Sequence, residues 1–404
     1  MNIIFITDVS IQDEISGAER VLFEQTTRLA ARGHQVHILT RRLKNHVADQ
    51  AVIQGVHEWR YPVNQDNAAS FLASTLRNGK RLFETLNDTY QFDCINFHQP
   101  FSALAALRSD ACKKIRKVYT CHSLSFEEYV SRNARPPSLV HRIAYLLNRT
   151  ARKWIEKQVL NKSDHIVVLS QYTLDKIVNI HHIPIEKIAI VPGGIDLTRF
   201  HPATDKTAVR DRLNLPREKM ILLTIRDLEP RMGIENLIRA IQNVANAIPD
   251  IYLIIGGSGP LKEHLTDTGH RLKLDHLIKF TGFIPEETLP EYYRAADVFV
   301  LPTVELEGFG LVTLEALASG TPVLGTPVGG TQEILSRFDK KFLFDDSSSE
   351  SISRLLTKTC QGYRNKPDDW HDDSRRCRHF SEEHYSWETN IAATERLFSD
   401  NIHP

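Results

Sequence analysis

The chain has 404 residues, enough for two or three domains with hydrophobic cores of their own. Its 50 basic and 50 acidic side chains give a formal net charge of zero, which argues against a nucleic-acid-binding protein. The five cysteines include no C-x-x-C pair, which argues against a disulfide scaffold or a thiolate zinc site and favours a cytoplasmic protein. We also expect no secretory signal or membrane span, because MNIIFITD lacks a cationic start and no apolar run reaches ~18 residues.

Short β-branched runs alternate with segments of helical periodicity, which is typical of parallel sheets covered by helices. In the first half, a helix is predicted over residues 17–32, ending at Gly33. The predicted strands of the first half are residues 2–7, 35–40, 93–97, 117–120, 165–169 and 187–191. Those of the second half are residues 220–225, 251–255, 278–281, 298–301 and 322–324. The fold class is therefore α/β.

A Gly193-Gly194 turn separates the two halves of this pattern. We predict an N-terminal domain over residues 1–195, a C-terminal domain over 196–385 and a final helical segment over 386–404. In open parallel sheets, ligands bind beyond the carboxyl ends of the strands. Polar residues and glycines follow the predicted strands in both halves, so we expect a ligand cleft between two facing sheet edges.

The most informative segment spans residues 305–322. A predicted strand ends just before it at Leu301, a loop then carries Glu307, and a helix is predicted to begin near Gly310 or Leu311. A strand, a loop and a helix in this order place the start of the helix at the ligand edge of the sheet.

The residue types at this helix start suit a nucleoside diphosphate. Gly308 and Gly310 lack Cβ atoms, so a ligand can approach the backbone closely. The N–H groups of Leu311 and Val312, together with the helix dipole, favour an anion. Glu315 lies one turn further on and could accept two hydrogen bonds from a ribose diol. From the residues alone, the alternative is that Glu315 is an ordinary exposed helix residue with no ligand.

The Glu307–Glu315 spacing, E-x7-E, resembles the motif of the family 4 glycosyltransferases, retaining enzymes of the GT-B fold. One such pair alone would be weak evidence, since two glutamates occur at this spacing by chance. Further segments resemble the family in the same order, so that the resemblance extends over nearly the whole chain. They are SGAERV (16–21), VYTCH (118–122), VPGGID (191–196), AADV (295–298) and SWE (386–388).

The resemblance implies two Rossmann-like, doubly wound domains facing across a cleft, with a C-terminal helix near residues 387–398 returning to the N-terminal domain. It implies retaining transfer of a hexose from a nucleoside diphosphate sugar, most often a UDP- or GDP-sugar, to an acceptor hydroxyl. The acceptor would be a sugar, a glycolipid or a polysaccharide precursor. No metal ion and no cofactor besides the donor are implied, and the chain contains no D-x-D motif.

The matched positions imply two catalytic residues. Glu307 would face the donor sugar, and His122 would lie beside the transferring sugar and contact its hydroxyls or the acceptor. Gly17 would lie in the loop where the donor diphosphate and the acceptor meet. A structural histidine at a strand end is the alternative for His122.

The other implied donor contacts lie in the second half of the chain. Glu315 would hold the ribose, and the nucleobase would rest near Gly257 and the backbone around Phe283. The segment before Glu315 would offer its backbone to sugar and phosphate, namely Gly308, Phe309, Gly310, Leu311 and Val312.

The chain departs from the family after the first strand of the second half. The family usually has an arginine and a lysine there for the diphosphate, whereas this chain has Asp227 and Met232 at those positions. A carboxylate about 4 Å from a phosphate would cost about 4 kcal/mol at an effective dielectric constant near 20. We therefore expect Asp227 to point away, with Arg226 and Arg231 supplying the charge.

Two other functions stay open on the same fold. Asp227 and Met232 motivate a catalytically silent partner or regulatory subunit. A sucrose-synthase-like or phosphorylase-like enzyme is the other alternative, and it would use fructose or free phosphate.

Two local clusters suggest further surfaces. Asp368-Asp369 and Asp372-Asp373 resemble metal ligands but are predicted to lie in a solvated loop. Residues 132–162 hold eight basic side chains against one acidic side chain, and part of this segment predicts a basic helical stripe beside an apolar one. That pattern suits peripheral contact with the inner face of a membrane through residues 138–160, and it equally suits a solvated face of a packed helix. The stripe residues are Arg142, Arg149, Lys153 and Lys157, and the apolar neighbours are Leu139, Ile143, Leu147 and Trp154.

Overall fold

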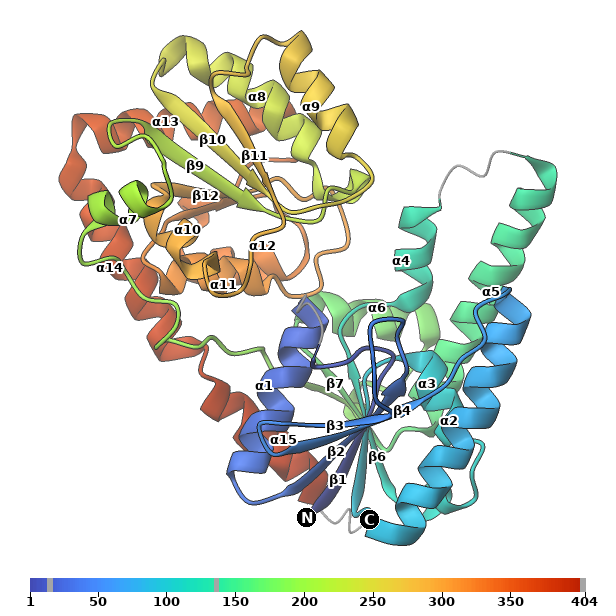
Figure 1. Ribbon diagram of the computed structural model, residues 1–404. Coiled ribbons are helices and arrows are strands. Elements are labelled where there is room, and N and C mark those ends of the chain that lie inside the picture. Colours follow the sequence, from blue (N-terminus) through green and yellow to red (C-terminus); the bar gives the residue numbers. More distant parts are fainter. Residues whose placement is uncertain (13–16, 134–137, 400–404) are drawn as a thin grey trace. The chain divides into compact units, whose positions relative to one another are not determined.

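The computed structural model of the chain describes residues 1–12, 17–133 and 138–399 (Figure 1). The chain forms two compact units, each an α/β structure built on one sheet. The first unit comprises Met1–Pro192 together with the segment that begins at Trp387, and the second comprises Gly193–Ser386. The predicted α/β class is therefore confirmed.

The first unit contains an eight-stranded sheet in the order β3-β4-β2-β1-β5-β6-β7-β8. All neighbours are parallel except β3 and β4, which pair antiparallel. The strands are β1 (Asn2–Ile6), β2 (Gln35–Arg41), β3 (Gln50–Ile53), β4 (Val56–Tyr61), β5 (Cys94–Phe97), β6 (Arg116–Cys121), β7 (His165–Val168) and β8 (Ile188–Ile190). The six strands predicted here are confirmed, with each end within one residue.

The β3–β4 hairpin was not predicted. Its two-residue turn consists of Gln54 and Gly55, both at positive φ (47° and 83°), as a type I′ turn requires. The usual sequence signal for this turn is Asn-Gly or Asp-Gly, and Gln-Gly lacks it.

Helices cover both faces of this sheet. Ile3 and Phe5 of β1 belong to a core with residues of α1 and α15, whereas Ile4 and Ile6 belong to a core with residues of α2, α3, α5 and α6. Alternate strand residues therefore serve opposite faces, as in a doubly wound sheet. The helices are α1 (Gly17–Ala31), α2 (Ala68–Tyr90), α3 (Pro100–Ala106), α4 (Ser125–Arg132), α5 (Leu139–Lys162), α6 (Gln171–His181) and α15 (Trp387–Ser399), with single 3₁₀ turns η1 (Ala111–Lys114) and η2 (Ile185–Lys187).

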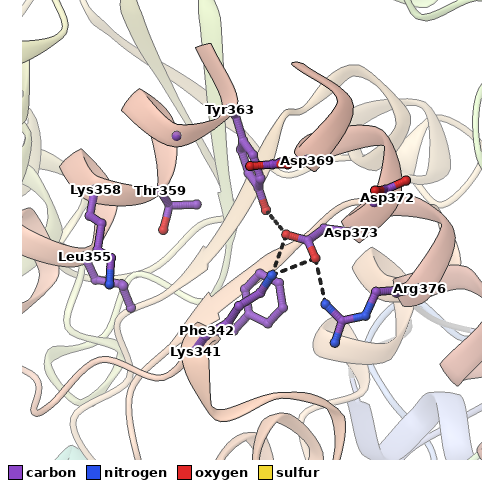
Figure 2. Close-up of a pocket in the computed structure, with 11 residues that line it drawn as sticks. Lys341, Phe342, Leu355, Lys358, Thr359, Tyr363, Asp369, Asp372, Asp373 and Arg376 are labelled. Atoms are coloured by element: carbon purple, nitrogen blue, oxygen red, sulfur yellow. Dashed lines mark hydrogen bonds and ion pairs between the residues drawn. The ribbon is translucent and has the colours of Figure 1, made fainter. Parts of the chain in front are cut away.

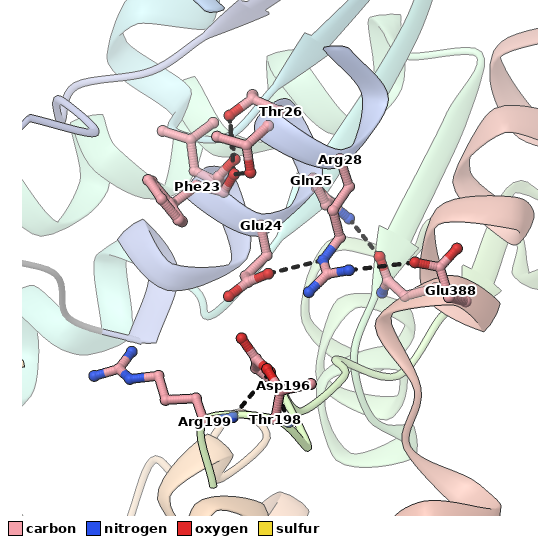
Figure 3. Close-up of polar contacts among 12 residues, drawn as sticks. Phe23, Glu24, Gln25, Thr26, Arg28, Asp196, Thr198, Arg199 and Glu388 are labelled. Atoms are coloured by element: carbon pink, nitrogen blue, oxygen red, sulfur yellow. Dashed lines mark hydrogen bonds and ion pairs between the residues drawn. The ribbon is translucent and has the colours of Figure 1, made fainter. Parts of the chain in front are cut away.

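The C-terminal helix α15 returns to pack on α1, as predicted. Gln25 donates its amide to Asn390 at 3.1 Å, and both side chains are buried. Arg28 and Arg32 both pair with Glu388, at 3.2 and 2.6 Å (Figure 3 shows the Arg28 pair). A polar interface of this kind joins two helices that lie more than 350 residues apart in the chain.

The second unit has a five-stranded, wholly parallel sheet in the order β11-β10-β9-β12-β13. The strands are β9 (Met220–Ile225), β10 (Ile251–Gly256), β11 (Ile278–Gly282), β12 (Val298–Leu301) and β13 (Val323–Gly325), and all five were predicted within one residue. The helices are α7 (Lys206–Arg212), α8 (Ile234–Ala247), α9 (Lys262–Arg271), α10 (Leu289–Ala295), α11 (Leu311–Ala318), α12 (Gly329–Phe338), α13 (Ser349–Asn365) and α14 (Pro367–His384), with 3₁₀ turns η3 (Pro230–Met232) and η4 (Lys340–Phe342).

The prediction of a solvated loop around Asp368-Asp369 and Asp372-Asp373 is wrong, because these residues lie in α14. Pro367 opens the helix and the first two aspartates occupy its first turn, where both residue types favour a helix start. Asp373 is buried and accepts hydrogen bonds from Lys341, Tyr363 and Arg376 (Figure 2). A pocket of about 480 Å³ adjoins this cluster. The aspartate thus joins α14 to neighbouring elements.

All five cysteines are free and buried. Among the helices of the described ranges, none is both long enough and apolar enough to cross a bilayer.

Candidate functional site

Glu307 lies in the loop between β12 and α11, where its carboxylate is almost fully buried. It forms an ion pair with Arg226, which directly follows β9, the neighbour of β12 in the sheet. The hydroxyl of Thr303 donates to the same carboxylate at 3.2 Å. The guanidinium of Arg226 also contacts the sulfur of Met232 at 3.0 Å, while its buried Nε has no hydrogen-bond partner among the described residues. The ends of two adjacent strands thus bring a carboxylate and a guanidinium together.

Two glycines at the start of α12, Gly329 and Gly330, pack closely against the backbone of the Glu307 loop. The N–H of Gly330 donates to the carbonyl of Glu307 at 2.9 Å. A Cβ on Gly329, whose φ is +55°, would lie 1.9 Å from that same carbonyl oxygen. A Cβ on Gly330 would lie 2.3 Å from the carbonyl oxygen of Phe309. Sequence reasoning missed this pair, although a Gly-Gly after a predicted strand was the available signal.

The start of α11 matches the prediction of a helix beginning near Gly310 or Leu311. Gly310 is the N-cap residue and has a φ of +88°, and a Cβ there would approach the Thr331 hydroxyl to 2.7 Å. The first N–H groups of a helix have no acceptor within the helix, so they are available to an anion. Phe309 and Leu311 have buried side chains, so a ligand at this point could contact their backbone but not their side chains.

Glu315 lies one turn into α11 and is buried, which excludes the alternative of an ordinary exposed helix residue. The phenol of Tyr293, on α10, donates to its Oε2 at 2.7 Å. Burial and the neighbouring Glu315 raise the pKa of Tyr293 well above 10, so the phenol stays a donor. The carboxylate is thereby held in one orientation before any ligand arrives.

The end of β10 also approaches β9 closely. Gly257 has a φ of +121°, and a Cβ there would lie 1.9 Å from the carbonyl oxygen of Arg226. Phe283, which follows β11, is 48% exposed although it is a large apolar side chain. An exposed aromatic ring close to Gly257, where no side chain blocks approach to the backbone, could stack on a planar ligand.

The basic residues after β9 have different partners. Arg231 donates to the carbonyl of Leu306 at 3.0 Å and pairs with Glu229 at 3.3 Å, so it braces the Glu307 loop. Asp227 is exposed. A direct contact between Arg231 and a phosphate stays a prediction.

Two predicted residues, Gly17 and His122, belong to the first unit. Gly17 is the first residue of α1, and Ser16 of the same motif lies outside the described residues. A nitrogen of His122, Nε2, lies 3.0 Å from Nδ1 of His98, so one ring donates to the other. Burial lowers the pKa of His122 to about 4 and also lowers that of His98, so both rings are neutral at pH 7. Nε2 of His98 is buried and has no partner among the described residues.

At this edge of the first unit the sequence analysis assigned no role to Asp8 or Arg152. Asp8 follows β1, and its buried Oδ1 has no hydrogen-bond partner in the described ranges. Burial raises its pKa, and the charges of Arg41 and, more weakly, Arg152 oppose that effect. The guanidinium of Arg152 lies over the rings of Phe101 (4.9 Å) and Tyr129 (4.8 Å). The position of Asp8 immediately after the first strand was the signal for it, whereas nothing in the sequence marked Arg152.

The described residues include no cluster of three or more His, Cys, Asp or Glu side chains placed to hold a metal ion.

The predicted site residues fall into two groups, with Gly17 and His122 in the first unit and the others in the second.

Comparison with known proteins assigns the family. The model "Glycosyltransferase Family 4" matches residues 15–199, and the model "Glycosyl transferases group 1" matches residues 205–376. The chain therefore belongs to the family 4 glycosyltransferases, as its motifs predicted.

Individual relatives agree with this assignment. The chain is 26% identical over 352 residues to mannosylfructose-phosphate synthase of Agrobacterium fabrum, covering 83% of this chain and 77% of the relative. Its fold is similar to that of sucrose-phosphate synthase from Thermosynechococcus elongatus, with a TM-score of 0.83, 22% identity and 98% of each chain covered. It is also similar to Anabaena HepE in complex with UDP-glucose, with a TM-score of 0.76, 16% identity and 99% of each chain covered. The fold is GT-B, as predicted.

Proposed function

We propose that this glycosyltransferase moves a hexose from a nucleoside diphosphate sugar, a UDP- or GDP-sugar, to an acceptor hydroxyl with retention of the anomeric configuration. The observation that carries the proposal is the buried Arg226–Glu307 pair beside the open N-terminus of α11. The solved structure of Anabaena HepE with UDP-glucose and the similarity to a mannosylfructose-phosphate synthase support the donor class.

The donor would bind through its charge and its ribose. The diphosphate would lie against the first N–H groups of α11, with Arg226 completing the positive environment. Glu315, oriented by Tyr293, would accept hydrogen bonds from the ribose hydroxyls. The base would lie near Gly257 and Phe283, where the exposed ring provides a stacking surface.

In the reaction, the bond between the anomeric carbon and the diphosphate oxygen breaks, and a bond to the acceptor oxygen forms on the same face of the sugar. The acceptor proton passes to the departing diphosphate, so charge and atoms balance. The α11 amides and Arg226 stabilise the charge that grows on the leaving diphosphate. Glu307 would face the donor sugar and shield the positive charge that develops at its ring.

On the acceptor side, the neutral His122–His98 pair would contact sugar hydroxyls, because Nε2 of His98 has no hydrogen-bond partner within the described part of the chain. The acceptor would be a carbohydrate or a lipid-linked carbohydrate. No metal ion would be required, since amide groups and a guanidinium already provide positive charge for the diphosphate. The five free cysteines support a reducing compartment such as the cytoplasm.

The test is release of free nucleotide from a panel of UDP-, GDP- and ADP-sugars in the presence of mixed carbohydrate acceptors. One or more donors should be consumed, and the product should keep the donor's anomeric configuration by NMR. Inversion would overturn the retaining assignment.

Asp227 and Met232 favour a second candidate, a catalytically silent subunit, because they replace the family's usual basic residues. Calorimetry with the same panel separates the two, since a silent subunit would bind none of the nucleotide sugars. Use of fructose or free phosphate as acceptor would instead identify a sucrose-synthase-like or phosphorylase-like enzyme.

A further inference from the structure

Helix α5 exposes a row of large apolar side chains in its first two-thirds. Their exposed fractions run from 48% for Leu146 to 75% for Val140. The α5 apolar row consists of Leu139, Val140, Ile143, Leu146, Leu147 and Trp154. In Figure 1 the first turns of α5 extend beside α4, beyond the other helices of the same unit. Six exposed apolar residues on one helix form a contiguous patch rather than scattered positions.

The row lies on the side of α5 that faces away from its own unit. At 100° per residue the six side chains cover a face about 120° wide. The buried residues near the other end of the helix include Val159, which points roughly 160° away from the middle of the row. A helix that packs with one face normally carries polar residues on the opposite face. This helix has a packed apolar face and a second, solvent-facing apolar face.

Basic side chains border the row on one side. Arg142, Arg149, Lys153 and Lys157 are all exposed. None of the four makes an ion pair with any residue in the described part of the chain. The only acidic residue of α5, Glu156, is fully buried and binds the His181 ring at 2.8 Å and the Ser125 N–H at 2.7 Å. The exposed surface of α5 therefore has no carboxylate to offset the four cations.

We propose that the α5 apolar row docks this protein on a bilayer surface that contains anionic lipid. The apolar side chains would enter the boundary between headgroups and acyl chains, and the basic side chains would reach lipid phosphates beside them. A second copy of the chain is a poorer occupant, because pairing two such faces would bring the cationic flanks of both copies close together. The inference does not depend on the proposed transfer reaction, since docking needs neither donor nor acceptor.

The test is flotation of the full chain with vesicles of phosphatidylcholine alone and with vesicles of phosphatidylcholine and phosphatidylglycerol. The wild type should float with the anionic vesicles and lose this binding in high salt. The double substitution Ile143→Ser with Leu147→Ser should lower the bound fraction at least ten-fold, as should Arg142→Glu with Arg149→Glu. The matched control is Arg77→Glu with Arg81→Glu, which reverses two exposed charges on α2 and should bind like the wild type.

Each other outcome overturns the proposal. Wild type that stays with the soluble fraction, or row variants that float as well as wild type, would show that the row does not bind lipid. Dimerisation in analytical ultracentrifugation that the Ile143→Ser, Leu147→Ser variant abolishes would identify a second copy as the occupant. Thermal unfolding of every variant is measured alongside, and because the substituted side chains are exposed, we expect midpoints close to that of the wild type.

Discussion

Arg226 and Glu307 form an ion pair whose two side chains are only 8% and 9% exposed. They lie 81 residues apart in the chain and meet because β9 and β12 are neighbours in the sheet. The Nε–H of the Arg226 guanidinium is buried and has no hydrogen-bond partner among the described residues, so it could donate to an anion. Arg226, which the sequence analysis expected to supply positive charge, thus lies at the candidate site and pairs directly with the first glutamate of the E-x7-E motif.

Replacing Glu307 should lower turnover more than donor affinity. Glu307→Gln keeps a polar group beside Arg226 but removes the charge that would face the donor sugar, so kcat should fall by roughly 100-fold. Glu305→Gln is the matched control, since Glu305 is an exposed glutamate two residues away and should retain full turnover. Equal kcat values for wild type and Glu307→Gln would remove Glu307 from the catalytic site.

Replacing Glu315 should weaken donor binding. Glu315→Ala removes the carboxylate that would hold the ribose, so Kd for the nucleotide sugar in calorimetry should rise by roughly 10- to 100-fold, as for the loss of one or two hydrogen bonds to a charged group. Tyr293→Phe leaves the carboxylate in place and removes only its orienting hydrogen bond, so it should have a smaller effect. A larger loss with Tyr293→Phe than with Glu315→Ala would contradict a direct contact of Glu315 with the ribose.

A side chain at Gly329 should displace the Glu307 loop. Gly329→Ala would place a Cβ 1.9 Å from the Glu307 carbonyl oxygen at a positive φ, so both the unfolding midpoint and the activity should fall, the latter by at least about ten-fold. Gly362→Ala is the control, because its Cβ would meet nothing within 4 Å in the helix α13. That variant should be as stable as wild type or slightly more stable. A normal Gly329→Ala enzyme would show that the loop does not depend on this contact.

The buried histidines should make the protein less stable in acid. Burial lowers the folded-state pKa of His122 to about 4, whereas the unfolded chain has the ordinary value of 6.5. Between these values the unfolded state binds more protons, so stability falls as the pH decreases from 6.5 towards 4. Unfolding midpoints measured over this range should decline less steeply in His122→Gln than in wild type. Identical slopes would mean that His122 titrates normally in the folded protein.

Chelation should leave the transferase activity unchanged. If the α11 amides and Arg226 carry the diphosphate charge, nucleotide release in EDTA should match that in buffer with Mg²⁺. A loss of activity in EDTA that Mg²⁺ restores would contradict the metal-independent proposal.

The local geometry of the candidate site in the second unit could largely be predicted from contiguous sequence. The strand before Glu307, the glycine at the helix start and the position of Glu315 one turn later are features of a single continuous segment. These features follow from the local order of strand, loop and helix, so predicting them requires no knowledge of residues elsewhere in the chain. The same holds for most strands of the two sheets, which β-branched runs mark directly, whereas β3 and β4 were not predicted.

Contacts between residues that lie far apart in the sequence could not be predicted from the sequence. The pairing of Arg226 with Glu307, the contact of Gly329 with the loop and the burial of Asp373 depend on which strands and helices lie side by side. Periodicity within one element carries no information about the order of strands in a sheet. The loop assigned to the aspartates was wrong because composition was weighed above the proline and the acidic first turn of α14.

By itself, the sequence determined the class of fold and the family, because each is encoded in short, contiguous patterns. Only the tertiary structure decided which side chains are paired and which are exposed. The face of α5 illustrates the difference. Its apolar and basic residues were visible in the sequence, but a buried and an exposed apolar stripe look alike there. Burial is a property of what packs against a surface, so only the folded unit shows that the α5 apolar row is uncovered within it.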